Sequence, residues 1–203
     1  MTAFRTSGFL FPALWTAVLF AQPVAPVTIA SGRITGKDLG EVQAWLGIPY
    51  AAPPIGDLRW KPPQPPSSWN GVRAMDHYGA VCMQSKVLAA GQPMSEDCLT
   101  LNVRAPKGAQ KAAVMLWIHG GAFVEGSGAM PVYAGTELAR QGVVVVTINY
   151  RLGDFGFFAH SANLDYGKHP LDVVYKPDYH SVCIGFPSSE IPKEVGHVSN
   201  RNC

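Results

Sequence analysis

Residues 112–123 read AAVMLWIHGGAF, a nearly continuous apolar run that ends at once in a glycine-rich loop. A second apolar run, VVVVTI at residues 143–148, follows further along the chain. Runs rich in β-branched residues are typical of parallel strands that are covered on both faces. Between the runs, residues 136–141 are helix formers, and Gly142 is a natural helix stop. The order strand, loop, short helix, strand therefore predicts an α/β fold.

Shorter β-prone segments precede this unit. Residues 27–34 and 42–45 are separated by a turn-rich connection at 35–40, which suggests an N-terminal hairpin. Residues 99–103 alternate apolar and polar side chains, as a half-buried strand does. Prolines dominate residues 47–69, so this stretch is expected to run irregularly over the surface.

The composition is that of one globular domain. The chain has 203 residues, of which 47% are hydrophobic and 15% charged, so it has enough apolar material for a core and too little charge for disorder. The formal net charge is +2 and the basic residues are scattered, which excludes the electrostatic footprint of a nucleic-acid-binding protein. No metal-ligand spacing and no nucleotide-binding loop is present, so we expect no metal and no cofactor.

The N-terminus is typical of a secretory signal peptide. One cation, Arg5, precedes the uncharged residues 8–21, and small residues and prolines follow. A membrane anchor would need about 20 apolar residues, and prolines interrupt this stretch. We therefore expect no stable anchor, cleavage near Ala21, and a secreted or periplasmic protein.

Four cysteines are present, and export makes disulfides permissible. Cys82 and Cys98 flank a loop-like segment, so they form either a disulfide worth about 3 kcal/mol in the chain-entropy model or two free buried thiols. The sequence assigns no partner to Cys183 or Cys203.

The loop at residues 119–123 is the candidate functional element. Glycines after a strand either turn the chain or bring backbone N–H groups close to a ligand, because a Cβ would obstruct the approach. Taken alone, the loop does not decide between these two readings.

Four motifs in order resemble the type B carboxylesterase and cholinesterase family, in particular its para-nitrobenzyl esterase-like members. The resemblance covers about residues 27–159. The motifs are LGIPYA at 46–51 running on to GDLRW at 56–60, SEDCLTLNV at 95–103, WIHGGAF at 117–123, and NYRLG at 149–153 with FGF at 155–157.

The resemblance implies the N-terminal part of an α/β-hydrolase fold, with an incomplete mixed sheet, and the activity of a serine carboxylesterase on small-molecule carboxylic esters. It implies that Gly121 and Ala122 donate N–H groups to the oxyanion and that Gly120 lets the loop turn. His119 is expected to position the loop and not to transfer protons, because the catalytic histidine of the family comes much later in the chain.

The resemblance also implies two structural links outside the loop. One is a disulfide between Cys82 and Cys98. The other is an ion pair between Arg59 and Glu96, two charges that would otherwise be read as solvated surface residues.

The chain departs from the family at the nucleophile. A serine esterase needs a Gly-x-Ser-x-Gly elbow, and none of the 203 residues forms one. Ser127 lacks the glycine two places before it, and residues 185–189 carry proline where the serine should stand. A dyad of His180 with Ser181 or Cys183 is rejected, because adjacent side chains of an extended chain point in opposite directions. Neither nucleophile, acid nor base is found.

Three segments are expected: the signal peptide at residues 1–21, the N-terminal part of the carboxylesterase domain at 22–165, and a divergent tail at 166–203. We expect a chain truncated before the nucleophile and inactive by itself. In related proteins the nucleophile strand pairs beside the strand ending at Ile118, so that strand should have an open apolar edge. The alternative is a non-catalytic cholinesterase-like binding protein.

Overall fold

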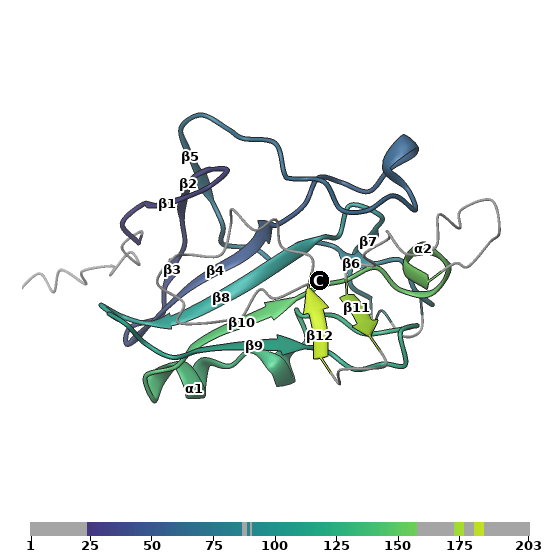
Figure 1. The fold of residues 1–203 in the computed structure, drawn as a ribbon. Coiled ribbons are helices and arrows are strands. Elements are labelled where there is room, and N and C mark those ends of the chain that lie inside the picture. Colours follow the sequence, from purple (N-terminus) through teal and green to yellow (C-terminus); the bar gives the residue numbers. More distant parts are fainter. Residues whose placement is uncertain (1–23, 87–88, 90, 158–172, 177–180, 185–203) are drawn as a thin grey trace, which may run out of the picture.

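The computed structural model describes residues 24–86, 89, 91–157, 173–176 and 181–184 (Figure 1). The predicted signal peptide lies outside the described residues, as does most of the predicted tail.

A five-stranded mixed sheet forms the body of the protein. The two long apolar runs are its strands β9 and β10, which pair in parallel, and every other pair in this sheet is antiparallel. The α/β prediction is therefore confirmed for this unit. In sheet order the strands are β3 (Lys37–Asp38), β4 (Val42–Pro49), β8 (Thr100–Pro106), β10 (Val144–Ile148) and β9 (Val114–Ile118).

The register of the parallel pair positions the candidate site. Ile118 lies opposite Ile148, so β9 and β10 end at the same level. Their following segments, which begin at His119 and Asn149, therefore leave the same edge of the sheet side by side. The helix between the strands, α1 (Thr136–Arg140), falls where the sequence predicts it and packs against β10, β8 and β4.

The N-terminal hairpin exists but lies elsewhere than predicted. Residues 27–34 do not form one strand: β1 (Val27–Ile29) and β2 (Gly32–Thr35) form a hairpin with each other. The reason is Trp69, whose backbone N–H donates to the carbonyl of Ser31 and whose ring lies 2.6 Å from where a Cβ of Gly32 would stand. The connection at 35–40, expected to be a turn, contains β3.

Short elements occupy the rest of the described chain. Residues 50–71 contain no strand, as the prolines predict, although β4 continues through Pro49. The tail, for which no element was predicted, contains an antiparallel pair, β11 with β12. The bounds are β5 (Val72–Ala74), β6 (Val81–Cys82), β7 (Met94–Ser95), α2 (Gly153–Phe157), β11 (Val173–Lys176), β12 (Ser181–Ile184), and the 3₁₀ turns Gly56–Leu58 and Pro131–Tyr133.

Two hydrophobic clusters fill the core. One lies around Trp45 and Met75, near the N-terminal hairpin. The other lies at the ends of β9 and β10 and consists of Tyr50, Ala51, Cys82, Cys98, Leu99, Tyr150 and Leu152, with Leu101, Ile118 and Phe157 packed against it. The candidate loop therefore starts directly above a buried cluster.

The β9 edge is less covered than the sequence predicts. β10 is largely buried, but within the described residues β9 pairs with β10 alone, and Val114, Leu116 and Trp117 are about 40% exposed. The expectation of strands covered on both faces therefore fails for β9, and the expected open apolar edge is present in this part of the chain.

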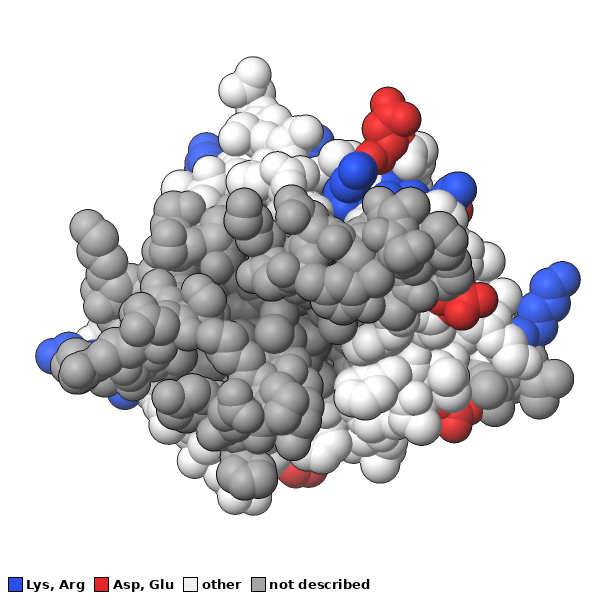
Figure 2. All heavy atoms as spheres, turned by 45° about the vertical axis from the view of Figure 1, so that its right-hand side comes forward, with Lys and Arg blue, Asp and Glu red and all other residues white. Residues whose placement is uncertain are grey.

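In Figure 2 the described basic and acidic side chains lie around the rim of the face, and some of opposite sign lie near one another. Among the described residues, no helix is both long and apolar enough to span a bilayer.

Candidate active-site loop

The loop that follows β9 starts on a buried histidine. His119 is 3% exposed, and its ring stacks on that of Tyr150 with 4.3 Å between the centroids. The Tyr150 hydroxyl donates to the carbonyl oxygen of His119 at 2.8 Å. Burial raises the pKa of Tyr150, so this hydroxyl keeps the proton that it donates. The first residue of the loop is thus held from two sides.

Burial also lowers the pKa of His119, because the charged imidazolium loses its hydration. Nδ1 lies 2.8 Å from the carbonyl oxygen of Gly120 and therefore carries the hydrogen of the neutral ring. Nε2 is buried without a hydrogen-bond partner in the described part of the chain. A second proton would have no acceptor there, so His119 is suited to holding the loop and unsuited to transferring protons.

Gly121 and Ala122 form the tip of the loop. The Gly121 carbonyl accepts hydrogen bonds from the N–H groups of Val124 and Glu125 at 3.0 and 3.1 Å, which closes a tight turn. Within the described residues, the N–H groups of Gly121 and Ala122 have no acceptor. Ala122 and Phe123 have φ angles of 51° and 62°, which non-glycine residues adopt only at a cost. The turn therefore presents two N–H groups that no described residue accepts from, in a strained backbone.

Glycine is required at Gly121 and not at Gly120. A Cβ on Gly121 would lie 2.0 Å from the carbonyl oxygen of Glu125, and the φ of Gly121 is +125°. A Cβ on Gly120 would meet no described atom within 4 Å, and its φ is not positive. The turning role that we expected of Gly120 thus belongs to Gly121 in this backbone.

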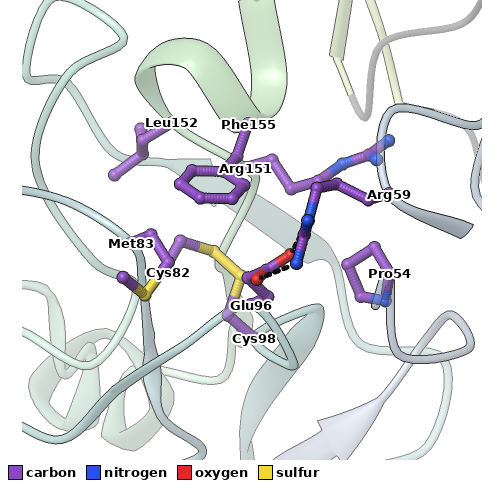
Figure 3. A pocket seen from close by; sticks show the side chains of 9 residues that line it. All are labelled: Pro54, Arg59, Cys82, Met83, Glu96, Cys98, Arg151, Leu152 and Phe155. Carbon is purple, nitrogen blue, oxygen red and sulfur yellow. Dashed lines mark hydrogen bonds and ion pairs between the residues drawn. A yellow bond between two sulfur atoms is a disulfide. The ribbon is translucent and has the colours of Figure 1, made fainter. Parts of the chain in front are cut away.

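Arg59 and Glu96 lie together, as the resemblance implies. The Arg59 Nε and Nη2 atoms donate to the two carboxylate oxygens of Glu96 at 2.5 and 2.6 Å, and this bidentate pairing raises the pKa of the guanidinium. The pair stands in a small pocket (Figure 3), lined by Pro54, Arg59, Cys82, Met83, Glu96, Cys98, Arg151, Leu152 and Phe155. No residue of the 119–123 loop lines this pocket, so the two features are separate.

The other predicted link is present too. Cys82 and Cys98 form a disulfide, with a sulfur–sulfur distance of 2.05 Å. Cys183 lies in β12, whose side chains are outside the description, and Cys203 lies outside the described residues.

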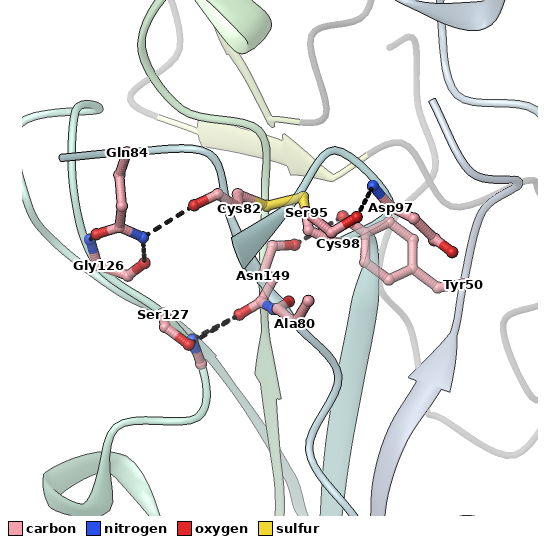
Figure 4. The surroundings of a disulfide bond; sticks show 11 residues. Tyr50, Ala80, Cys82, Gln84, Ser95, Asp97, Cys98, Gly126, Ser127 and Asn149 are labelled. Atoms are coloured by element: carbon pink, nitrogen blue, oxygen red, sulfur yellow. Dashed lines mark hydrogen bonds between the residues drawn. A yellow bond between two sulfur atoms is a disulfide. The ribbon is translucent and has the colours of Figure 1, made fainter. Parts of the chain in front are cut away.

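Side chains from distant parts of the chain hold residues 126–128, which follow the 119–123 loop (Figure 4). Gln84, close to the disulfide, forms two hydrogen bonds with the backbone of Gly126. Asn149 accepts from the Ser127 hydroxyl and from the Gly128 N–H with Oδ1, and donates to the carbonyl of Ala80 with Nδ2. Sequence reasoning did not assign these roles. Asn149 belongs to a family motif, but no sequence signal marks Gln84.

No nucleophile is assembled beside the loop by the described residues. Ser127 is 3% exposed. Its hydroxyl donates to Asn149 Oδ1 and accepts from the N–H of Ala129. The side chains of His180, Ser181 and Cys183 lie outside the description. Among the described residues, no three His, Cys, Asp or Glu side chains are grouped as a metal site would need.

A mixed sheet whose two parallel strands end side by side at a glycine-rich loop defines an α/β protein. A sequence profile of the carboxylesterase family matches residues 23–165. The chain belongs to the carboxylesterase family, and the resemblance seen in the motifs is confirmed.

Characterised relatives agree with this assignment. The chain is 47% identical to a fumonisin B1 esterase of Sphingopyxis macrogoltabida, over 73% of this chain and 30% of the esterase. It is 49% identical to the para-nitrobenzyl esterase of Bacillus subtilis (strain 168), over 64% and 28%. A solved PNB esterase matches 68% of this chain and 29% of its own with a TM-score of 0.64 and 47% identity. The fold is therefore the N-terminal part of an α/β-hydrolase, and the chain spans less than a third of the length of these relatives.

Because His119 is buried, we expect the folded protein to become less stable in acid. The folded-state pKa lies below the ordinary value of about 6.5, so below that pH the unfolded chain binds the extra proton more readily. The contribution of His119 should make the free energy of unfolding fall as pH drops below about 6.5, by up to about 1.4 kcal/mol per pH unit. Urea unfolding from pH 8.5 to 5 should show this fall in the wild type and a flatter curve in His119→Phe. Parallel curves throughout the range would contradict the prediction.

We expect glycine-to-alanine substitution to destabilise the protein at Gly121 but hardly at Gly120. Gly121→Ala should lower the free energy of unfolding by about 1 to 3 kcal/mol, because it adds a backbone clash to an unfavourable φ. Gly120→Ala, the matched control, should change it by less than about 0.5 kcal/mol, because its Cβ meets open space. Urea unfolding of the full chain measures both. Equal effects would show that the turn does not depend on glycine at 121.

Proposed function

We propose that this chain is the oxyanion-binding, N-terminal part of a serine carboxylesterase that hydrolyses small carboxylic esters. The observation that carries the proposal is the pair of N–H groups on Gly121 and Ala122, which have no acceptor among the described residues and follow the parallel pair of β9 and β10. Such donors stabilise the negative oxygen that forms when a nucleophile adds to an ester carbonyl. The esterases to which the chain is similar support the same reaction class.

The chemistry assigned to the loop is electrostatic. A serine oxygen bonds to the carbonyl carbon, its proton passes to a base, and the π electron pair moves to the carbonyl oxygen, to which the two N–H groups would donate. Collapse of this intermediate breaks the bond to the alcohol, which leaves with the proton. Water then repeats the sequence and releases the acid. Each donor of this kind contributes about 10²- to 10³-fold in kcat.

The nucleophile must come from polypeptide other than these 203 residues, since they contain no Gly-x-Ser-x-Gly elbow. We therefore propose that this chain by itself does not turn over esters. A non-catalytic, cholinesterase-like binding protein remains the second candidate, which the same missing elbow favours. Reading the gene past the Cys203 codon in all three frames separates the two, because an elbow there supports the esterase and its lack supports the binding protein.

The oxyanion role can be tested in a hybrid enzyme. Residues 24–157 would replace the matching segment of the Bacillus subtilis para-nitrobenzyl esterase, which is 49% identical over the aligned region. We expect the hybrid to hydrolyse p-nitrophenyl acetate, and Gly121→Ala in it to lower kcat by about 10²-fold or more. A folded hybrid without activity would overturn the role of the loop. Rapid, fluorophosphonate-sensitive hydrolysis by the purified 203-residue chain would overturn its proposed inactivity.

We also propose that the protein is exported, with residues 1–21 as a cleaved signal peptide. Support comes from the uncharged stretch behind Arg5 and from the Cys82–Cys98 disulfide, which fits an oxidising compartment. N-terminal sequencing of the protein from a bacterial periplasm should find a chain that starts at or near Gln22. A product that stays in the cytoplasm with Met1 intact would refute export.

A further inference from the structure

Both polar atoms of the Gln84 side-chain amide form hydrogen bonds with one residue, Gly126, which lies just after the 119–123 loop. Its Nε2 donates to the carbonyl of Gly126 at 2.9 Å, and its Oε1 accepts from the Gly126 N–H at 3.0 Å. The two residues are 42 positions apart in sequence. The side-chain amide thus pairs with the N–H and the C=O of one residue, as residues pair across an antiparallel sheet, and it fixes both the position and the orientation of Gly126.

Gly126 in turn lies directly against the start of the loop. A Cβ on Gly126 would lie 2.3 Å from His119 Nδ1 and 2.7 Å from the Gly120 carbonyl oxygen. The preceding residue, Glu125, donates to the Gly121 carbonyl, and its own carbonyl stands where a Gly121 Cβ would be. A shift of Gly126 must therefore move the turn that carries the Gly121 and Ala122 donors.

The conformation of Gln84 is itself fixed by the disulfide-bonded segment. Nε2 makes a second hydrogen bond, to the carbonyl of Cys82 at 3.1 Å, and Cys82 is bonded to Cys98. Both hydrogens of the side-chain amide are thus used, and the side chain is half-buried. Gln84 thus links the disulfide-bonded segment to Gly126 (Figure 4).

We propose that Gln84 is a positioning residue for the oxyanion donors, acting through Gly126 to hold the Gly121–Ala122 turn in register. The inference rests on the proposed function. It assigns to the Cys82–Cys98 segment a part in the esterase reaction, because the strained φ angles of Ala122 and Phe123 persist only if the surroundings hold them.

Two variants of Gln84 and one matched control separate shape from hydrogen bonding. Gln84→Met keeps the length of the side chain and removes both hydrogen bonds to Gly126. Gln84→Glu keeps the acceptor for the Gly126 N–H but, when ionised, turns an oxygen toward the carbonyls of Gly126 and Cys82. Once protonated, the same carboxyl can accept from the Gly126 N–H and donate its one hydrogen to the carbonyl of Gly126 or of Cys82. The matched control is Gln92→Met, in the same disulfide loop, because the Gln92 side chain makes no hydrogen bond to the described residues.

The first readout is amide hydrogen exchange in the full chain. Protection factors of Val124, Glu125 and Gly126, whose N–H groups bond within the turn or to Gln84, should fall about tenfold in Gln84→Met, while those of β8 and β10 stay unchanged. Gln84→Glu should show the same loss at pH 7 and regain part of the protection as the pH approaches the ordinary glutamate pKa of about 4.3, relative to the wild type at each pH. A uniform fall over the sheet, or no fall in the turn, would overturn the proposal.

The second readout is kinetic and uses the hybrid enzyme. Gln84→Met should lower kcat for p-nitrophenyl acetate by about tenfold or more with KM within about twofold, whereas Gln92→Met should leave both unchanged. An unchanged kcat in an active hybrid would overturn the role of Gln84. A folded hybrid that is inactive with Gln84 in place would instead overturn the proposed function, and the exchange data would then still show whether Gln84 holds the turn.

Discussion

The parallel pairing of β9 with β10 is the constraint on which the rest of the site depends. Because Ile118 lies opposite Ile148, the segments that follow the two strands leave the sheet at one level. Tyr150 can then stack on His119 and bond to its carbonyl, and Asn149 can bond to Gly128. A shift of the register by one residue would send the side chains of one strand to the opposite side and remove these contacts.

The loop is a costly conformation that is held at several points. Two non-glycine residues with positive φ cost on the order of 1 to 3 kcal/mol each, and the turn satisfies few of its own polar groups. Its anchors come from separate parts of the chain: Tyr150 at the start, the Gly153 N–H on the carbonyl of Phe123, and Gln84 at Gly126. Because the anchors are distributed, weakening one should loosen the turn locally and leave the sheet intact.

The sequence predicts the parts of this structure that depend on local patterns. The two apolar runs, at 112–118 and 143–148, form strands as predicted. The helix between them also lies where the run of helix formers predicts it. Residues 27–34 break into two strands because a distant tryptophan lies across Gly32, which no local pattern reveals. The same limit applies to the site. Which of two adjacent glycines is indispensable depends on where the Glu125 carbonyl stands, and the partner of Gly126 comes from 42 residues away.

The described residues orient the N–H groups of Gly121 and Ala122, the proposed oxyanion donors, but remove little water from them. Ala122 is exposed and Gly121 half-exposed, so water competes for both N–H groups. A hydrogen bond to a developing charge is worth far more in a dry site than in water, because the interaction energy rises as the effective dielectric constant falls. His119 adds no fixed charge to compensate, since burial keeps its ring neutral. Preorganisation and desolvation are therefore separable contributions in this protein. The loop provides the first, and among the described residues nothing provides the second at Ala122.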